Sequence, residues 1–389
     1  MRWPCFAAFS QLIWIKDRIG ESGNGGGRER HRPPGHLEAI IGELYPATLL
    51  ARLVTLNSNG DGADQGMPMM KLAWCAALLA LLPGAALAGT INPSGADDTA
   101  ALQQACNRGG IVVLSAGDYH VRTITCANIV SASTEAFFYY EGQQPTVRIR
   151  GIPAGARGVV VCPPPGPCAY RGFDISPPAG EAGIVLDSIH GAQLFDVSVV
   201  DDTGGQSGAC VDMNVTQVDN QNIVVRGGTY LHCGGWCFDF STKSDKGTSD
   251  SSWYGADIAN CGLGGVHIAF GYGNQFIGNR IQDQYAQPGV QLDSGGTIVL
   301  DGNLFDQNFS DVVLGNVYLV AAGNLSCRTQ GGAMFDLEGE VAINASGNLS
   351  CGPTYLVGTN GTLTGGAFYD PLPSYADPHT QQVLSGSIR

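Results

Sequence analysis

The chain has 389 residues, of which 56 are glycine and only 14% are charged. Asp and Glu outnumber Lys and Arg by 34 to 20, a net charge of -14 that argues against binding to the phosphate backbone of nucleic acids. The glycines show no Gly-X-Y period, which excludes collagen, and the 44% hydrophobic content excludes a largely disordered chain. Long stretches of Ala, Glu, Lys and Leu are missing, so we expect an all-β protein rather than a helical bundle.

An export signal is predicted at residues 69–88. A short positive start precedes the apolar run Leu72–Leu82, and the small-x-small sequence Ala86-Leu87-Ala88 follows it. The apolar run is too short to span a bilayer comfortably. Since a signal belongs at the N-terminus, we interpret residues 1–68 as a spurious or disordered extension. The mature chain, residues 89–389, is then secreted or periplasmic and leaves the membrane once the signal is cleaved.

The first element of the mature chain is a short helix over Ala100–Cys106. Asp97 and Asp98 precede it, and acidic residues are favourable at a helix N-terminus. A β-prone segment, Ile111–Leu114, follows the helix. We expect the helix to cover the open end of the strands that come after it, which would protect that edge from aggregation.

The rest of the chain is organised by a repeat. The phrase Gly-x-x-apolar-Asp recurs at steps of 21–30 residues, with full copies that end at Asp187, Asp212, Asp239, Asp293 and Asp336. Short strands at this period cannot bury an apolar face alone, but coils stacked in parallel about 4.8 Å apart can. We therefore predict a single parallel β-helix domain of roughly ten coils. Hairpin-rich sandwiches and the longer blades of propellers do not fit the period.

A second phrase, Gly-Asn, follows β-prone runs at four turns: Gly278-Asn279, Gly302-Asn303, Gly323-Asn324 and Gly347-Asn348. We expect these Asn side chains to be buried and to hydrogen-bond to one another along the axis of the helix.

The mature chain keeps ten cysteines, an even number, which in an exported protein indicates disulfides rather than a metal site. Residues at equivalent places in neighbouring coils lie within disulfide reach. The predicted pairs are Cys106–Cys126, Cys162–Cys168, Cys210–Cys237, Cys233–Cys261 and Cys327–Cys351.

The segments Asp97–Gln103 and Gly109–Tyr119 resemble the opening of the pectate-lyase-like superfamily of right-handed parallel β-helices. There a "DDTxAxQ" helix precedes a "GGxVxxPxGxY" strand pair; Ser115 stands in place of the proline. The resemblance implies a right-handed helix. It also implies action on an acidic polysaccharide as a hydrolase or lyase, although other members are epimerases or phage depolymerases. The polygalacturonase motifs are not present as a set, so no catalytic residue is carried over.

Stacked coils should place Asp187, Asp212 and Asp239 in a line on one face. Two carboxylates about 5 Å apart suit a glycosidase, because the like charge raises the pKa of one of them. His267 falls on the next coil, two residues earlier in its phrase, where it would orient or protonate a group in the same groove. We predict Asp212, Asp239 and His267 as catalytic. The competing interpretation is that these Asp side chains only accept hydrogen bonds from turns.

Substrate-binding residues are expected near this row: Trp236, Trp253 and Tyr254 as stacking rings, and Lys243 and Lys246 in an inserted loop. The hydrolase interpretation needs no cofactor. A uronate lyase would need a base beside a cation, for which Lys243 with Asp245 or Arg280 with Asp283 are candidates, and would add Ca²⁺ as a cofactor.

We therefore expect a secreted enzyme whose partner is a polysaccharide, which it cleaves by hydrolysis or by uronate β-elimination. The alternative is a non-catalytic β-helix, either a surface adhesin or a carbohydrate-binding protein. An enzyme should show clustered titratable groups in one groove, whereas a binder would show aromatic rings without them.

Overall fold

The computed structural model describes residues 87–132, 147–241, 247–327, 329, 332–351, 356–358 and 361–364. The chain divides into two units, 1–82 and 83–389, and every described residue belongs to the second. The extension at residues 1–68 and most of the predicted signal therefore lie outside the described residues. The last two residues of that signal begin strand β1 (Leu87–Ile91), which pairs in parallel with β2 (Ile111–Leu114).

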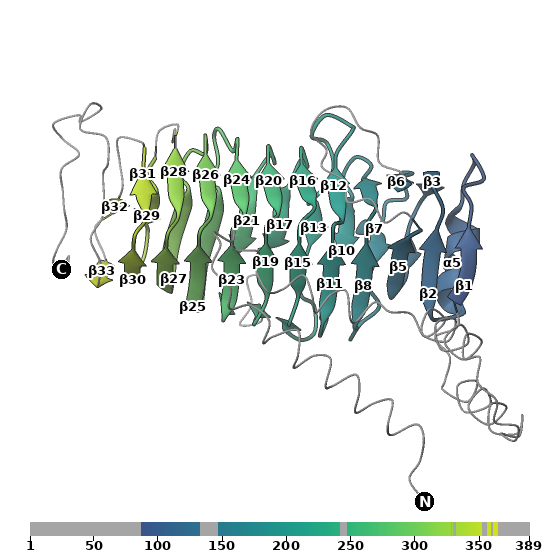
Figure 1. Ribbon diagram of the computed structural model, residues 1–389, viewed down its shortest axis with the longest axis horizontal. Coiled ribbons are helices and arrows are strands. Elements are labelled where there is room, and N and C mark those ends of the chain that lie inside the picture. The colour runs from purple at the N-terminus through teal and green to yellow at the C-terminus, as the bar shows by residue number, and fades with distance from the viewer. Residues whose placement is uncertain are drawn as a thin grey trace, which may run out of the picture. The chain divides into compact units, whose positions relative to one another are not determined.

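The described residues form a parallel β-helix, and every strand pairing among them is parallel, as the stacked arrows in Figure 1 show. One sheet has ten strands, one for each coil, which confirms the predicted coil number. We name the three sides of the helix by their strands. Residues 220–221, 248–249 and 271–272 form the short strands β14, β18 and β22 between face 1 and face 2.

Face 1 consists of β4 (Ile124–Thr125), β7 (Gly158–Val161), β10 (Ala182–Val185), β13 (Val211–Asp212), β17 (Trp236–Phe240), β21 (Gly264–Ile268), the first parts of β25 (Val290–Asp301) and β27 (Val312–Ala322), β29 (Phe335–Leu337) and β32 (Leu356–Gly358). Face 2 consists of β1, β2, β5 (Asn128–Ser131), β8 (Cys168–Arg171), β11 (Ala192–Phe195), β15 (Val224–Arg226), β19 (Ser252–Tyr254), β23 (Asn274–Ile277), the last parts of β25 and β27, β30 (Val341–Ser346) and β33 (Gly361–Thr364). Face 3 is the ten-stranded sheet of β3 (Gly117–Val121), β6 (Val147–Gly151), β9 (Asp174–Ser176), β12 (Ser198–Val200), β16 (Thr229–Leu231), β20 (Asp257–Ala259), β24 (Arg280–Gln282), β26 (Leu304–Asp306), β28 (Leu325–Cys327) and β31 (Leu349–Ser350).

The core is built from columns of apolar side chains that point inward from successive coils. Alternate residues of a strand face opposite sides, so each short strand supplies one or two inward residues. On face 1 the strand register stacks Ile184, Val211, Phe238, Val266, Val290, Val312 and Phe335, all at most 1% exposed. No coil could bury this column alone, which is why the coils fold as a stack.

Buried asparagines link the coils at the turn between face 2 and face 3, as predicted. The Nδ2 of Asn279 donates to Oδ1 of Asn303 at 3.0 Å, Asn303 donates to Asn324 at 2.9 Å, and Asn324 donates to Asn348 at 2.8 Å. All four are at most 1% exposed. The glycine before each Asn has a φ of 60–63°, so glycine takes the left-handed conformation and frees the Asn side chain to bond along the axis.

Helix α5 (Thr99–Asn107) confirms the predicted N-terminal helix, and its Leu102 and Ala105 are buried against the first coils. The acidic residues before it act differently from a standard N-cap. Asp98 makes no side-chain bond to a helix N–H, whereas Oδ1 of Asp97 accepts the Thr99 N–H at 3.0 Å. No helix in the described part of the chain is long and apolar enough to cross a membrane.

Five disulfides join the ten described cysteines, and two of the predicted pairings are wrong. The pairs Cys106–Cys126, Cys162–Cys168 and Cys327–Cys351 are confirmed. The other four cysteines pair as Cys210–Cys233 and Cys237–Cys261, with Cα atoms 5.5 and 5.6 Å apart. In each, a cysteine that follows a face 3 strand pairs with the cysteine at the face 1 strand with which the same coil began. The four meet at one corner, where Cys210 and Cys261 sulfurs are only 3.8 Å apart, so sequence spacing could not decide the pairing.

Buried Asp311 and Asp174 should make the fold more stable at lower pH. Burial raises the pKa of Asp311 to about 7, although the hydrogen bonds donated by Ser326 and Asn308 act to lower it. Burial likewise raises the pKa of Asp174 to about 6, although the charge of Arg148 acts to lower it. Between about pH 4 and pH 7 the folded state therefore holds protons that the unfolded state has lost. The free energy of unfolding should fall as the pH rises through this window.

Urea unfolding at a series of pH values would measure this slope. Asp311→Asn keeps an acceptor for Asn308 and a donor for Ser326, so it should flatten the slope without a large loss of stability. A wild-type chain whose stability rises from pH 5 to pH 7 would contradict the prediction. Asp97, whose pKa is lowered to about 2 by hydrogen bonds from Thr99 and Arg122, acts below this window.

Candidate active site

Two outward rows of side chains run along face 1, fixed by the strand register. Row A contains Val185, Asp212, Asp239, His267, Gln291, Val313 and Asp336. Row B lies two residues further along the chain in each coil, past the end of the strand except in β25, and contains Asp187, Asn214, Ser241, Ala269 and Asp293. The rows place Asp212, Asp239 and His267 side by side on successive coils, so the three residues predicted as catalytic do lie together.

The register corrects two details of the prediction. The strand partner of Asp212 is Val185, so Asp187 is not in line with Asp212. His267 pairs directly with Asp239, whereas the sequence had placed it two residues earlier. The repeat phrase has apolar residues at alternate positions. A shift of two residues therefore keeps every side chain on its own face of the sheet, and the phrase alone could not exclude that shift.

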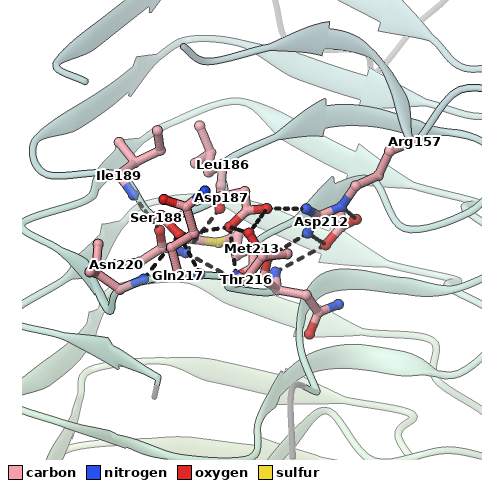
Figure 2. Close-up of polar contacts among 12 residues, drawn as sticks. Arg157, Leu186, Asp187, Ser188, Ile189, Asp212, Met213, Thr216, Gln217 and Asn220 are labelled. Carbon is pink, nitrogen blue, oxygen red and sulfur yellow. Dashed lines mark hydrogen bonds and ion pairs between the residues drawn. The ribbon is translucent and has the colours of Figure 1, made fainter. Parts of the chain in front are cut away.

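Arg157 closes one end of these rows by binding two carboxylates at once (Figure 2). Its Nε and Nη2 donate to the two oxygens of Asp212 at 2.5 and 2.8 Å, and its Nη1 donates to Asp187 at 2.6 Å. Nη2 also donates to the Asn214 carbonyl at 2.5 Å. The hydrogen bonds that Arg157 donates to Asp212 raise the pKa of Arg157 despite its partial burial. This two-pronged contact is the strong form of an ion pair and holds the Asp212 side chain in one orientation.

Asp187 is held as a carboxylate by the loop that follows β13. Thr216 donates its N–H at 2.7 Å and its hydroxyl at 2.9 Å, and Ser188 donates its hydroxyl at 2.9 Å. Burial alone would raise the pKa of Asp187, but these bonds and Arg157 outweigh it and lower the pKa. A small pocket of about 210 Å³ lies beside this cluster, lined by Arg157, Val161, Cys162, Pro164, Val185, Asp187, Ser188, Thr216 and Gln217. The lowered pKa keeps Asp187 ionised, so it cannot serve here as a proton donor, and Arg157 occupies both oxygens of Asp212.

The second group of ionisable side chains is Asp239, His267 and Asp293. Asp239 accepts hydrogen bonds from Asn214 Nδ2 and from the Ser241 N–H, both at 2.9 Å, and remains half-buried. His267 Nε2 lies 2.9 Å from Oδ2 of Asp293, whose side chain is 43% exposed. Gln291 donates to the other oxygen of Asp293 at 2.8 Å. Asp293 is thus an accessible carboxylate whose direction is fixed by two neighbours.

Trp236 holds His267 in place. The two rings are 4.8 Å apart, and the indole crosses Gly264, where a Cβ atom would lie only 2.2 Å from it. His267 Nδ1 is buried without a hydrogen-bond partner. Because Nε2 is taken by Asp293 and Nδ1 is covered, His267 presents no nitrogen to a substrate. Its Nε2 contacts Asp293 instead, which fits the orienting role, and not the protonating role, among the two expected from the sequence.

The predicted substrate-binding residues are dispersed. Trp253 is wrong as a stacking residue, because it points inward, is 0% exposed and packs face to face on Phe276 with ring centres 4.4 Å apart. Trp236 is 8% exposed and packs against the ring of His267. Tyr254 lies on face 2, and Lys243 and Lys246 lie outside the described residues. Of the two candidate lyase pairs, Lys243 with Asp245 lies outside the described residues, and Arg280 belongs to face 3 rather than face 1.

One set of three potential metal ligands occurs in the described part of the chain: Cys210, Cys237 and Cys261. All three sulfurs are in disulfides, so they cannot serve as thiolate ligands.

Two site residues, Arg157 and Asp293, were missed by sequence reasoning. Asp293 was assigned to the repeat phrase and so appeared to continue a structural ladder. The strand register pairs His267 with Gln291, and Asp293, two residues further along the same strand, reaches His267 with its side chain. This contact could be found only once the register was known. Arg157 lies just before β7 and reaches over two coils to Asp212, a contact for which the sequence contains no spacing signal.

Comparison with known proteins finds similar solved structures but no matching family model and no matching curated protein. ORF18 of Geobacillus virus E2 is 15% identical with a TM-score of 0.47; the match covers 80% of this chain and 66% of the viral protein, just under two thirds. An alginate lyase from Paenibacillus sp. str. FPU-7 is 14% identical with a TM-score of 0.49, covering 71% of this chain and 98% of the lyase. The surface protein and adhesin PfbA of Streptococcus pneumoniae is 10% identical with a TM-score of 0.45, covering 72% and 98%. All three TM-scores are below 0.5, so function rests on the residues of this chain.

Proposed function

We propose that the chain is an exported enzyme that hydrolyses a polysaccharide lying along face 1, with Asp239 and Asp293 as the reacting carboxylates. The observation that carries the proposal is the grouping of Asp239, His267 and Asp293 on one face. There two half-exposed carboxylates flank a histidine whose position is fixed by Trp236.

We also propose that the chain belongs with the pectate-lyase-like β-helices. Five disulfides favour export, because disulfides persist in oxidising compartments.

The spacing of the two carboxylates favours hydrolysis with inversion. Asp293 stands two coils and two residues from Asp239, which puts their Cα atoms roughly 12 Å apart. An Asp carboxyl lies about 2.5 Å from its own Cα, so these two carboxyl groups cannot approach to the roughly 5 Å of a retaining glycosidase, whereas the roughly 6.5–9.5 Å of an inverting one, which leaves room for water, is within their reach. In this arrangement one carboxyl group protonates the leaving oxygen while the other activates the water. Asp212 is closer to Asp239, but Arg157 occupies both of its oxygens.

The charge of face 1 favours hydrolysis over elimination. A lyase must neutralise the uronate carboxylate with a cation. Among the described residues of rows A and B and the loop before β7, Arg157 is the one Arg or Lys, and Asp187 and Asp212 already neutralise it. Asp239 and Asp293 would repel a uronate. A neutral polysaccharide is therefore the substrate class that this face fits best.

Non-catalytic binding of a polysaccharide is the second candidate. It is favoured by the contacts of Arg157 with Asp187 and Asp212. These carboxylates are bound by groups of the protein itself, and this structural role needs no reaction. This candidate predicts retention of the chain on a polysaccharide without any product.

A panel of neutral and acidic polysaccharides distinguishes these functions when reducing ends and the absorbance of unsaturated products are followed separately. Hydrolysis predicts new reducing ends from a neutral polymer without unsaturated products. Unsaturated products would overturn the proposal in favour of a lyase. Binding to a polymer without either product would favour the second candidate.

A further inference from the structure

An alternating column of arginine and aromatic side chains runs along the outside of face 2, away from rows A and B. The strand register places Arg171, Phe195, Arg226, Tyr254 and Ile277 side by side on five successive coils. Both arginines are exposed, and both aromatic rings are half-buried. We call these five residues the face 2 column.

Arg226 lies between the two rings of this column. Its guanidinium carbon is 5.7 Å from the centre of the Phe195 ring and 5.8 Å from that of Tyr254. Stacking of this kind holds the planar guanidinium in one orientation, so less freedom is lost when it binds a ligand. The donor edge of Arg226 is therefore arranged before any ligand arrives.

Arg226 also differs from other arginines of the fold in its charge balance. Arg122, Arg148, Arg150 and Arg157 each have a carboxylate oxygen within 4.0 Å. No ion pair of Arg226 is found among the described residues. Asp196, at the turn after Phe195, is the acid that influences it electrostatically. Burial raises the pKa of this acid even though Arg171 and Arg226 act to lower it.

We propose that the face 2 column is a binding site for an acidic polysaccharide, which stacks on Phe195 and Tyr254 and places a carboxylate against Arg226. A guanidinium whose position is fixed binds a carboxylate through two parallel hydrogen bonds. Arg171 stands two coils away, roughly 10 Å along the axis, and offers positive charge to a second anionic group of an extended polymer. A flat column of rings and cations suits a linear chain that crosses successive coils.

The site goes beyond the proposed hydrolysis, because it lies on another face and needs no reaction. The whole chain carries a net charge of -14, so general electrostatics oppose the binding of a polyanion. Retention of an acidic polysaccharide would therefore report a local site. Such a site would anchor the protein to an acidic matrix while face 1 acts on a neutral polymer.

Affinity electrophoresis through gels that contain polygalacturonate tests the proposal, with the Asp239→Asn variant as the background so that cleavage does not interfere. We expect retardation by polygalacturonate but not by dextran. Arg226→Ala should raise the dissociation constant at least tenfold, and Arg226→Lys should restore binding only in part because lysine lacks the planar fork. Arg122→Ala is the matched control, since it removes the same charge from an exposed arginine elsewhere. All variants should keep the wild-type melting temperature.

Three results would overturn the site: equal retardation by dextran, an equal effect of Arg226→Ala and Arg122→Ala, or equal binding of poly-glutamate with the same dependence on Arg226. The last would show that a polyanion suffices without sugar rings. These outcomes are independent of the proposed hydrolysis. Arg226→Ala in the otherwise wild-type chain should release reducing ends from a neutral polymer at the normal rate.

Discussion

Asn303→Ala should lower the free energy of unfolding by about 2–6 kcal/mol, because it leaves at least two buried backbone groups without partners at about 1–3 kcal/mol each. The Oδ1 of Asn303 accepts the Asn279 N–H at 3.0 Å, and its Nδ2 donates to the Phe276 carbonyl at 2.9 Å and to Asn324 at 2.9 Å. Asn303 is 1% exposed, so water cannot replace these bonds. Alanine also interrupts the ladder in its middle, where the coils on both sides depend on it.

Urea unfolding of Asn303→Ala and of Asn344→Ala measures this effect against a matched control. Asn344 lies on the exposed side of β30, where replacing it should change the stability by less than about 0.5 kcal/mol. If both variants unfold at the same urea concentration, the Asn ladder does not stabilise the helix as we describe.

The ladder and the coil number could be predicted because they depend on local chemistry that recurs. Glycine before each Asn supplies a positive φ, and a buried Asn can bond only to groups above and below it along the axis. Such a requirement appears in the sequence as Gly-Asn in four successive coils. The helix over Thr99–Asn107 was likewise visible from its own residues.

The register, and with it the details of the site, could not be predicted in this way. Strand pairs tolerate a shift of two residues without moving any side chain to the other face, so the repeat phrase aligned Asp187 with Asp212 although Val185 is the partner. The same shift concealed the contact between His267 and Asp293. Four cysteines at one corner allow three pairing schemes, and equivalent places in the repeat favoured the wrong one.

The inward or outward direction of an aromatic residue was the other uncertainty. Trp253 and Tyr254 are adjacent in the sequence and were both expected to bind sugar. Alternation along β19 sends Trp253 into the core against Phe276 and Tyr254 outward beside Arg226. A single strand of three residues is too short for its apolar pattern to decide which of the two faces inward.

Asp239→Asn and Asp293→Asn should each reduce the rate of polysaccharide hydrolysis by about 10²–10⁴-fold, the range typical of a lost general acid or base. Asparagine keeps the shape of the side chain and can still accept a hydrogen bond from Asn214 or Gln291, so the fold should be unaffected. The measurement is the initial rate of reducing-end release, with melting temperatures recorded in parallel. Nuclear magnetic resonance of the first product should show an inverted anomeric centre.

Asp336→Asn and Asp212→Asn separate this mechanism from a general effect of negative charge. Asp336 belongs to row A but lies two coils beyond Gln291, so its replacement should leave the rate unchanged. Asp212→Asn removes the negative charge that pairs with Arg157 and should lower the free energy of unfolding. The protein that remains folded should still be active. A retained anomeric configuration, together with a rate loss confined to Asp212→Asn and Asp239→Asn, would instead assign the reaction to the adjacent pair. In that case Arg157 would have to release Asp212 before the substrate could react.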